Sequence, residues 1–202
     1  MYLPRHFRED DTGTAIEMAR SVGFGHLVVH GVDGLSSTPM PFLIADDGAM
    51  VRGHLARPNA VWRSAPCEAL LVVPVSDAYV SPSWYPSKAE HGKVVPTWNY
   101  EVVHLHGRLI AHDDADWTAT MVNDLTDLNE ASLPSPWSVH DAPADYIDQL
   151  MRGIVGVALE VSRIEAKRKL SQNKSDTDVA GIIAGLADSP RSGAEAVRQA
   201  ML

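Results

Sequence analysis

Hydrophobic and polar residues alternate along a segment in the middle of the chain, PTWNYEVVHLHGRLIAHDD, which begins at Pro96. A period of two is typical of a half-buried β-strand, and it places Val103, Leu105 and Leu109 on the apolar face. Continued backwards, the same period puts Asn99 on that face. An unpaired buried amide costs about 1–3 kcal/mol, so the sequence predicts a polar partner for Asn99.

Other apolar stretches predict further strands, in FGHLVVHG, TPMPFLIA, AMVRGHL, CEALLVVPVSDAYVS and GIVGVALEVSRIEA. The triplet DDG at Asp46 to Gly48 is a hairpin turn signal between the second and the third of these stretches. Short turns and few helices between the early strands favour an antiparallel barrel or sandwich. We therefore expect a mainly β fold with helices at its flanks.

Two helices are predicted outside the C-terminal region. The segment TAIEMARSVG repeats apolar residues at Ile16 and Ala19, which suits a short helix before the first strand. The segment ADWTATMVNDLTDLNE repeats them at Met121, Leu125 and Leu128, and a proline-rich loop, SLPSPWSVHDAP, follows it.

Two more helices are predicted near the C-terminus. Ser175 and Asp178 have the spacing of a capping box before a helix. Its apolar positions are Val179, Ile182, Ile183 and Leu186. The segment SPRSGAEAVRQAML predicts a second helix with Pro190 near its first turn. At 202 residues the chain fits a single domain, residues 1–202, with a helical C-terminal segment from about residue 175 to 202.

Cysteine content and the N-terminus indicate the compartment. Cys67, the one cysteine, lies in the apolar run CEALLVV, where a buried structural thiol is expected. The start, MYLPRHFREDD, lacks the apolar core of a signal peptide, and no apolar run approaches the length of a membrane span. We expect a soluble, cytoplasmic protein that is not associated with a membrane.

Charge argues against a broad nucleic-acid surface. Seventeen Lys and Arg residues against 26 Asp and Glu residues leave a formal charge of −9. Any anion site must therefore be local. One basic cluster, AKRKLSQNKS, contains Lys167, Arg168, Lys169 and Lys174, and it is either a solvated strand end or an anion site.

The segment GHLARPNAVW predicts one such local site. A strand runs directly into a short helix in which Pro58 suits the first helical position. Free backbone N–H groups at that helix start, beside Arg57 and His54, match a phosphate group. The alternative is that Arg57 is an ordinary surface residue.

Aromatic residues gather in the window from Tyr79 to Tyr100, which holds five of the ten Trp and Tyr residues of the chain. Beside Asn99 and Lys88, this density suggests either a planar ligand or a subunit interface.

His104 and His106 share one strand face, but no Cys, Asp or Glu ligand joins them at the same spacing. We therefore predict an exposed or interface pair and no metal site. The sequence also contains no Gly-x-Ser-x-Gly elbow, Walker loop or Gly-x-Gly-x-x-Gly motif, so hydrolase and nucleotidase functions have no support and no catalytic residue is identified.

Taken in order, several stretches resemble the PaiB family of FMN-binding negative transcriptional regulators. They are MYLPRHF, GHLARPN, YVSPSWYPSK, PTWNY with the following HLHG, the PW-x-V-x-DAP of Pro136 to Pro143, and KLSQN. Pro74, Ser76 and Asp77 depart from the Phe-x-Gly-Pro of the family. The resemblance implies a split β-barrel like that of pyridoxine-phosphate oxidase, in a homodimer with FMN bound where the two subunits meet.

The same resemblance implies roles for individual residues. Arg57, with His54 and Asn59, would hold the FMN phosphate. Trp98, Asn99 and Tyr100 would lie near the isoalloxazine, which would supply the polar partner of Asn99. Lys169, Gln172 and Asn173 would close the site from the same or the other subunit.

Three functions stay open at this point. The first is a regulatory flavoprotein with FMN as a sensed or structural ligand, whose partner is DNA or a regulatory protein, although the sequence shows no helix-turn-helix. The second is a flavin-dependent oxidoreductase, such as an NAD(P)H-dependent flavin reductase. The third is binding of haem or another planar ligand, with His104 or His106 as an axial ligand. We rank them in this order.

Overall fold

Within residues 1–32 and 34–202, which the computed structural model describes, seven strands form one sheet. They are β1 (Arg8–Glu9), β2 (Phe24–Gly31), β3 (Gly34–Ile44), β4 (Met50–Ala56), β5 (Cys67–Val80), β6 (Thr97–His112) and β7 (Ile154–Lys169). Each predicted strand segment is present. The hairpin turn at the DDG triplet joins β3 to β4, and Gly48 adopts there a φ of +70° that favours glycine.

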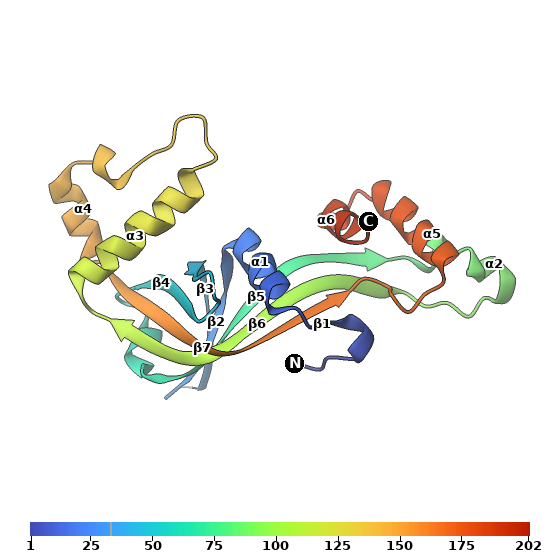
Figure 1. Ribbon diagram of the computed structural model, residues 1–202, viewed down its shortest axis with the longest axis horizontal. Helices are drawn as coiled ribbons and strands as arrows, with labels where there is room; N and C mark the ends of the chain where they lie inside the picture. The colour runs from blue at the N-terminus through green and yellow to red at the C-terminus, as the bar shows by residue number, and fades with distance from the viewer. Residues whose placement is uncertain (33) are drawn as a thin grey trace. The chain divides into compact units, whose positions relative to one another are not determined.

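The strands hydrogen-bond in the order β1-β7-β4-β3-β2-β5-β6, and β6 also pairs with β7 (Figure 1). Six strands therefore form a closed ring, and β1 extends it by pairing with β7. The registers of β2 with β3, β2 with β5, β3 with β4 and β4 with β7 are all antiparallel. The predicted mainly β, antiparallel architecture is confirmed.

Helices flank the strands. The α-helices are α1 (Thr12–Val22), α2 (Ser87–His91), α3 (Ala115–Glu130), α4 (Ala144–Met151), α5 (Asp176–Ala187) and α6 (Ala194–Ala200). Short 3-10 helices are η1 (Arg5–Phe7), η2 (Ala60–Ser64), η3 (Pro82–Trp84) and η4 (Val139–Asp141). None of the described helices is long and apolar enough to cross a membrane.

The chain divides into two compact units. The first unit comprises Met1–Ala15, Pro74–Val103 and Glu165–Leu202, and the second comprises Ile16–Val73 and His104–Ile164. The three strands β5, β6 and β7 each contribute residues to both units.

Apolar side chains fill the interior of the second unit. Strands β2, β3, β4, β5, β6 and β7 all supply inward-facing residues, which are Leu27, Met40, Val51, Leu71, Leu109, Val157 and Leu159. The space left between them is about 10 Å³. A flavin-sized ligand needs a site of several hundred Å³, so a cofactor must bind outside this interior.

Close contact between β6 and β7 depends on Gly107. A Cβ atom at Gly107 would overlap the backbone carbonyl of Glu160 on β7. A larger residue at this position would therefore push the two strands apart, which explains the glycine in an otherwise continuous strand.

Helix α3 covers the second unit on the side of β4. It has the bounds that the sequence predicts, and Met121 and Leu125 are buried. Leu128, the third predicted apolar position, is 51% exposed, because the buried stripe of the helix ends one turn earlier. Helix α4, which the hydrophobic pattern did not predict, packs beside α3.

His54 on β4 faces helix α3. It pairs in register with Gly156 on β7, and a Cβ atom at Gly156 would overlap the Trp117 ring of α3. Directly paired residues point to the same face, so His54 lies under the helix as well. Its Nδ1 atom is buried and has no hydrogen-bond partner among the residues that the structure describes, and burial lowers the pKa of His54.

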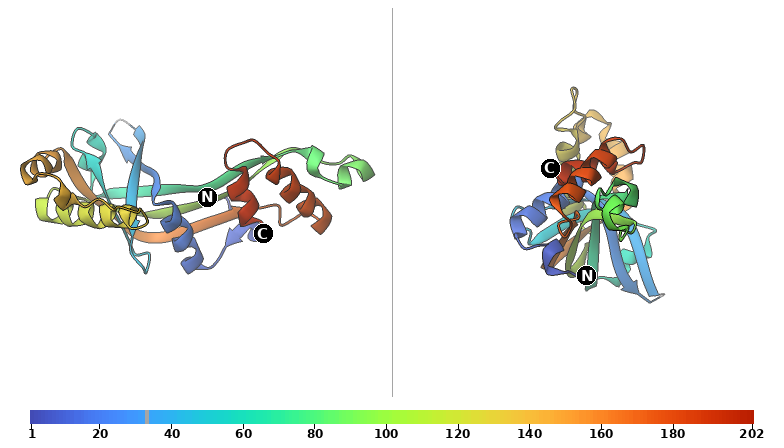
Figure 2. Two further views of the ribbon diagram at one scale, coloured as in Figure 1. Left: turned by 90° about the horizontal axis from the view of Figure 1, so that it is seen from above. Right: turned by 90° about the vertical axis from the view of Figure 1, so that its right-hand side faces the viewer.

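The C-terminal helices α5 and α6 pack side by side in the first unit (Figure 2). Ser175 caps α5 by accepting from the backbone N–H of Asp178 at 3.2 Å. The reciprocal half of the predicted capping box is absent, because the Asp178 carboxylate accepts from the N–H and hydroxyl of Ser87 at 3.1 and 2.8 Å. Pro190 lies ahead of α6, which begins at Ala194 after a Gly193 cap, so the proline is near the start of the helix but outside its first turn.

Side chains of both helices and the ends of β5 and β7 form a second apolar cluster. Its buried members are Ala78, Val80, Tyr85, Leu170, Ile182, Leu186, Ala194 and Val197. Val179 and Ile183, also predicted to be buried, are half-buried on α5.

The half-buried imidazole of His54 makes the stability of the protein depend on pH. The unfolded chain takes up a proton near pH 6.5, whereas the folded chain takes it up at a lower pH. The free energy of unfolding should therefore fall as the pH drops below about 6.5, by at most about 1.4 kcal/mol per pH unit from this group. Urea titrations between pH 5 and 8 should show this slope.

The substitution His54→Gln should reduce that slope, because the variant has no titrating ring at this position. His26→Gln is the matched control, since His26 is exposed on β2. Equal slopes in the wild type and His54→Gln would contradict the prediction.

Candidate functional site

The residues predicted to bind a flavin fall into two groups, one in each unit. The second unit holds His54, Arg57 and Asn59. The first unit holds Trp98, Asn99, Tyr100, Lys169, Gln172 and Asn173.

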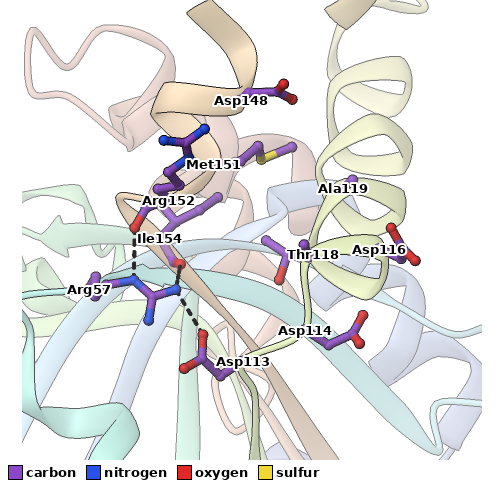
Figure 3. Close-up of a pocket in the computed structure, with 11 residues that line it drawn as sticks. Arg57, Asp113, Asp114, Asp116, Thr118, Ala119, Asp148, Met151, Arg152 and Ile154 are labelled. Carbon is purple, nitrogen blue, oxygen red and sulfur yellow. Dashed lines mark hydrogen bonds and ion pairs between the residues drawn. The ribbon is translucent and has the colours of Figure 1, made fainter. Parts of the chain in front are cut away.

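Arg57 follows strand β4 directly, and three acceptors hold its guanidinium (Figure 3). Its Nε donates to the carbonyl oxygen of Arg152 at 2.8 Å, and a terminal nitrogen donates to that of Ile154 at 3.0 Å. The same nitrogen bonds to Asp113 Oδ1 at 2.8 Å, which raises the pKa of Arg57 and lowers the pKa of Asp113. Arg57 thus ties the end of β4 to the start of β7.

A pocket of about 370 Å³ lies beside Arg57. Its charged lining residues are Arg57, Arg152, Asp113, Asp114, Asp116 and Asp148. Four carboxylates outnumber two guanidinium groups, so the local potential disfavours a phosphate dianion. Arg57 can hold a phosphate here if it releases Asp113.

Asn59 caps the short helix that follows β4. Its Oδ1 accepts from the backbone N–H of Val61 at 3.0 Å, and its Nδ2 donates to Thr38 Oγ1 at 3.1 Å. The helix η2 is a 3-10 helix that begins at Ala60, so Pro58 precedes the cap and does not occupy the first helical position as predicted. The amide oxygen of Asn59 already satisfies one of the free N–H groups at the helix start, that of Val61.

Lys169 links the end of β7 to the start of β6. Its Nζ donates to Thr97 Oγ1 at 2.8 Å and to the carbonyl oxygen of Trp98. The Tyr100 ring centroid lies 5.9 Å from the same nitrogen. The structure thus brings three predicted residues together, Lys169, Trp98 and Tyr100. Burial, followed by the charges of Lys167 and Lys174, lowers the pKa of Lys169.

Lys167 belongs to the basic cluster that the sequence predicts to be either a solvated strand end or an anion site, but the family resemblance gives it no role. It is 8% exposed, and its Nζ donates to the carbonyl oxygen of Tyr2 at 3.2 Å. The ring centroids of Tyr2 and Tyr100 lie 5.6 and 5.3 Å from this nitrogen. The sequence could have indicated this residue, because the period of two along β7 puts Lys167 on the same strand face as Lys169.

Asn99 is fully buried, and its partner belongs to the same chain. The hydroxyl of Ser171 donates to Asn99 Oδ1 at 3.0 Å, and Asn99 Nδ2 lies 3.5 Å from Met201 Sδ. The predicted polar partner of Asn99 is therefore present, but Ser171 supplies it where the family resemblance implied a flavin.

Gln172 and Asn173 lie in the turn after β7, and both are exposed. The Gln172 side chain donates to the carbonyl oxygen of Arg168 at 2.6 Å and accepts from the N–H of Leu170 at 2.8 Å. Gln172 therefore stabilises its own turn in this structure.

The aromatic window divides into core and surface. Tyr85 is buried, and Trp84 packs against α5 at Gly185, where a Cβ atom would overlap the indole. Trp98 is 49% exposed, and its ring meets Tyr79 edge to face with centroids 6.0 Å apart. Trp98 with Tyr79 is thus the part of the window that a planar ligand can reach.

A planar, anionic ligand such as a flavin fits these residues of the first unit. The exposed Trp98 ring provides an aromatic surface. Lys167 and Lys169 provide ammonium donors that no carboxylate in the described part of the chain pairs with. The donor set therefore suits the group that the family resemblance implies.

Comparison with known proteins places the chain in a family. The family described as "Putative FMN-binding domain" matches residues 1–163. The protein named protease synthase and sporulation protein PAI 2, from Bacillus subtilis, is 29% identical over 205 residues, which cover 100% of this chain and 96% of that protein. An uncharacterised protein of Emericella nidulans is 30% identical over 188 residues, 75% of this chain and 74% of that protein.

Solved structures share the fold at low identity. The flavocytochrome Anf3 of Azotobacter vinelandii has a TM-score of 0.61 at 16% identity and covers 89% of this chain and 78% of its own. An FAD and haem binding protein of Mycobacterium smegmatis has a TM-score of 0.59 at 13% identity, with coverages of 86% and 78%. The closed antiparallel ring is therefore a split β-barrel, as the sequence analysis predicted. The chain belongs to the FMN-binding domain family, that of PaiB, and its cofactor is a flavin.

Proposed function

We propose that this protein binds FMN at the aromatic surface of Trp98 and acts as a regulator of the PaiB type, with FMN as a sensed or structural ligand. The observation that carries the proposal is the half-exposed Trp98 ring at the start of β6, next to Tyr100 and Lys169, in a chain of this family. A large aromatic residue with an exposed face is suited to cover a planar ring.

FMN, when bound, supplies a redox-active ring whose chemistry is that of the cofactor itself. The chain's residues would bind and orient it. Trp98 and Tyr100 would exclude water from the ring, and Lys169, Gln172 and Asn173 would close the site. Arg57, with His54 and Asn59, would hold the phosphate, which requires Arg57 to exchange Asp113 for the ligand. Asn99 would lie near the ring without bonding to it directly, because its amide oxygen already accepts from Ser171. Its bond to Ser171 would help to hold strand β6 in place beside the ring.

The regulatory role is proposed to depend on a partner. A formal charge of −9 disfavours wide contact with DNA phosphates. The basic residues of the β7 end are few, so direct DNA binding would be weak and sensitive to salt. A regulatory protein that responds to the flavin-bound form is therefore the better partner, with DNA as the alternative.

Flavin-dependent oxidoreductase activity is the second candidate, and haem binding is the third. The proteins of Azotobacter and Mycobacterium with the same fold include a flavocytochrome and an FAD and haem binding protein. His104 and His106, half-buried on β6 with ring centroids 6.0 Å apart, are the haem candidates. Comparing reduction of the bound flavin by NADH and NADPH with that of free FMN separates the enzyme from the sensor.

A homodimer is part of the proposal. In the second unit, Val32 is fully exposed and Leu35 is 77% exposed beside a groove of about 540 Å³. Exposed apolar residues lining a groove are typical of an interaction surface. A second copy of the chain is the occupant that the family resemblance implies.

The cofactor identity is tested by the absorption spectrum and by extraction. The purified protein should show flavin bands, and the extracted flavin should be FMN when analysed by chromatography and mass spectrometry. Titration of flavin-free protein should show tighter binding of FMN than of FAD or riboflavin. Extraction of FAD, or a Soret band in place of flavin bands, would overturn the FMN assignment.

Sedimentation velocity tests the homodimer. The wild-type protein should sediment as a dimer at micromolar concentration, and Leu35→Asp should shift it toward monomer, because a buried unpaired carboxylate destabilises the interface. Leu133→Asp is the matched control, since Leu133 is 49% exposed in the loop after α3. A monodisperse wild-type monomer would rule the dimer out.

Comparing the binding of FMN with that of riboflavin distinguishes an Arg57 that binds the phosphate from an Arg57 that only stabilises the fold. Arg57→Ala should weaken FMN binding about 10- to 150-fold and leave riboflavin, which lacks the phosphate, unchanged. Asp113→Asn should tighten FMN up to about fivefold, because it removes the competing carboxylate. Isothermal titration measures both.

Arg52→Ala is the control for that experiment, since Arg52 lies on β4, close in sequence to Arg57, and likewise pairs with an aspartate, Asp124, at 2.9 Å. It should leave both flavins unaffected. Equal losses of FMN and riboflavin in Arg57→Ala would show that Arg57 acts through its link between β4 and β7.

A further inference from the structure

Two lysine side chains of β7 carry positive charge that the described chain does not neutralise. Lys167 is 8% exposed and Lys169 is half-buried, and neither forms an ion pair within residues 1–32 and 34–202. Arg168, between them in sequence, points to the opposite face and bonds to Glu101 Oε1 at 2.8 Å. The absence of a counter-charge is therefore specific to the lysine face of the strand.

One aromatic ring lies within about 6 Å of both ammonium groups. The Tyr100 ring centroid lies 5.3 Å from Lys167 Nζ and 5.9 Å from Lys169 Nζ, and the rings of Tyr2 and Phe7 flank the pair. Ring quadrupoles attract cations but carry no net charge, so the double positive charge persists. Burial lowers the pKa of Lys169, and the neighbouring charges of Lys167 and Lys174 lower it further.

The hydrogen-bond donors of the pair match a particular anion. An ammonium group has three donors. Lys167 Nζ uses one on Tyr2 within the described chain, and Lys169 Nζ uses two on Thr97 and Trp98. Three donors and two positive charges are left, which suit the three terminal oxygens and double charge of a phosphate monoester better than a single carboxylate.

We propose that Lys167 and Lys169 form a binding site for a phosphate monoester dianion. The phosphate belongs either to FMN itself or to a second phosphorylated ligand. In the first case the inference rests on the proposed binding of FMN, and the lysines replace Arg57 as the phosphate ligands. This site lies in the first unit, whereas Arg57 lies in the second. The two residue groups can therefore be tested independently.

Lys167→Met tests the proposal, because methionine keeps an unbranched apolar stem and removes the charge. The probe is inorganic phosphate, and the measurement is the melting temperature of flavin-free protein in potassium phosphate against potassium chloride at equal ionic strength. The wild type should show a saturable rise, and Lys167→Met should need at least about 10-fold more phosphate for the same rise.

Lys93→Met is the matched control, because Lys93 is exposed in the loop after α2. It should respond as the wild type does, and this comparison removes the general effect of phosphate on protein stability. A rise in Lys167→Met equal to that of the wild type, or no saturable rise in the wild type, would overturn the proposal.

Flavin titrations of Lys167→Met identify the source of the phosphate. If FMN supplies it, FMN binding should weaken about 10- to 150-fold while riboflavin binding is unchanged. If a second ligand supplies it, both flavins should bind normally although the response to phosphate is lost. Failure of the wild type to bind FMN at all would refute the proposed function but leave the phosphate response intact.

A measurement on the wild type does not depend on the folding of a variant. Phosphate at constant ionic strength should slow acetylation of Lys167 and Lys169 by acetic anhydride, followed by peptide mass spectrometry. Acetylation of Lys93 should not change. Equal protection of all three lysines, or protection of none, would contradict a specific site.

Discussion

The pairing of β6 with β7 is the interaction on which the rest of this structure depends. It converts an open sheet into a closed ring, and in the second unit it requires Gly107 at the close approach to Glu160. Closure removes the strand edges and lets apolar side chains fill the interior. Because no ligand-sized space is left inside, polar function has to be built on the outer faces of the same strands.

In the first unit, basic and aromatic residues gather on one face of that pairing. Where β6 and β7 lie next to each other, Lys169 reaches Thr97 and the backbone of Trp98, and Lys167 shares the Tyr100 ring. Side chains alternate between the two faces of β7, so Arg168 lies on the opposite face, where Glu101 neutralises its charge. One strand thus presents a neutralised cation on one face and two uncompensated cations on the other.

The two units offer opposite electrostatic environments to an anion. Around Arg57, carboxylates outnumber guanidinium groups, and Asp113 already occupies the guanidinium. Around Lys167 and Lys169 positive charge is in excess. A flavin-binding protein with a formal charge of −9 must concentrate its positive potential in this way, because its surface as a whole repels anions.

The sequence by itself determined the features that depend on neighbouring residues. The period of two defined β6 and its buried face, the DDG triplet defined the turn before β4, and Ser175 defined the start of α5. The family motifs predicted the split-barrel fold and the flavin cofactor. Each of these follows from short-range periodicity, from turn and cap chemistry, or from long motifs that can be recognised without coordinates.

Only the tertiary structure decided which partner each polar group takes. Asn99 pairs with Ser171, and Arg57 pairs with Asp113. The Asp178 carboxylate accepts from Ser87, so it does not complete the predicted capping box. Lys167 is buried between Tyr2 and Tyr100, which contact it from distant segments of the chain. These partners lie far apart in the chain, so strand pairing and helix docking select them. A local pattern can predict that a buried amide needs a partner, but the fold chooses which one it finds.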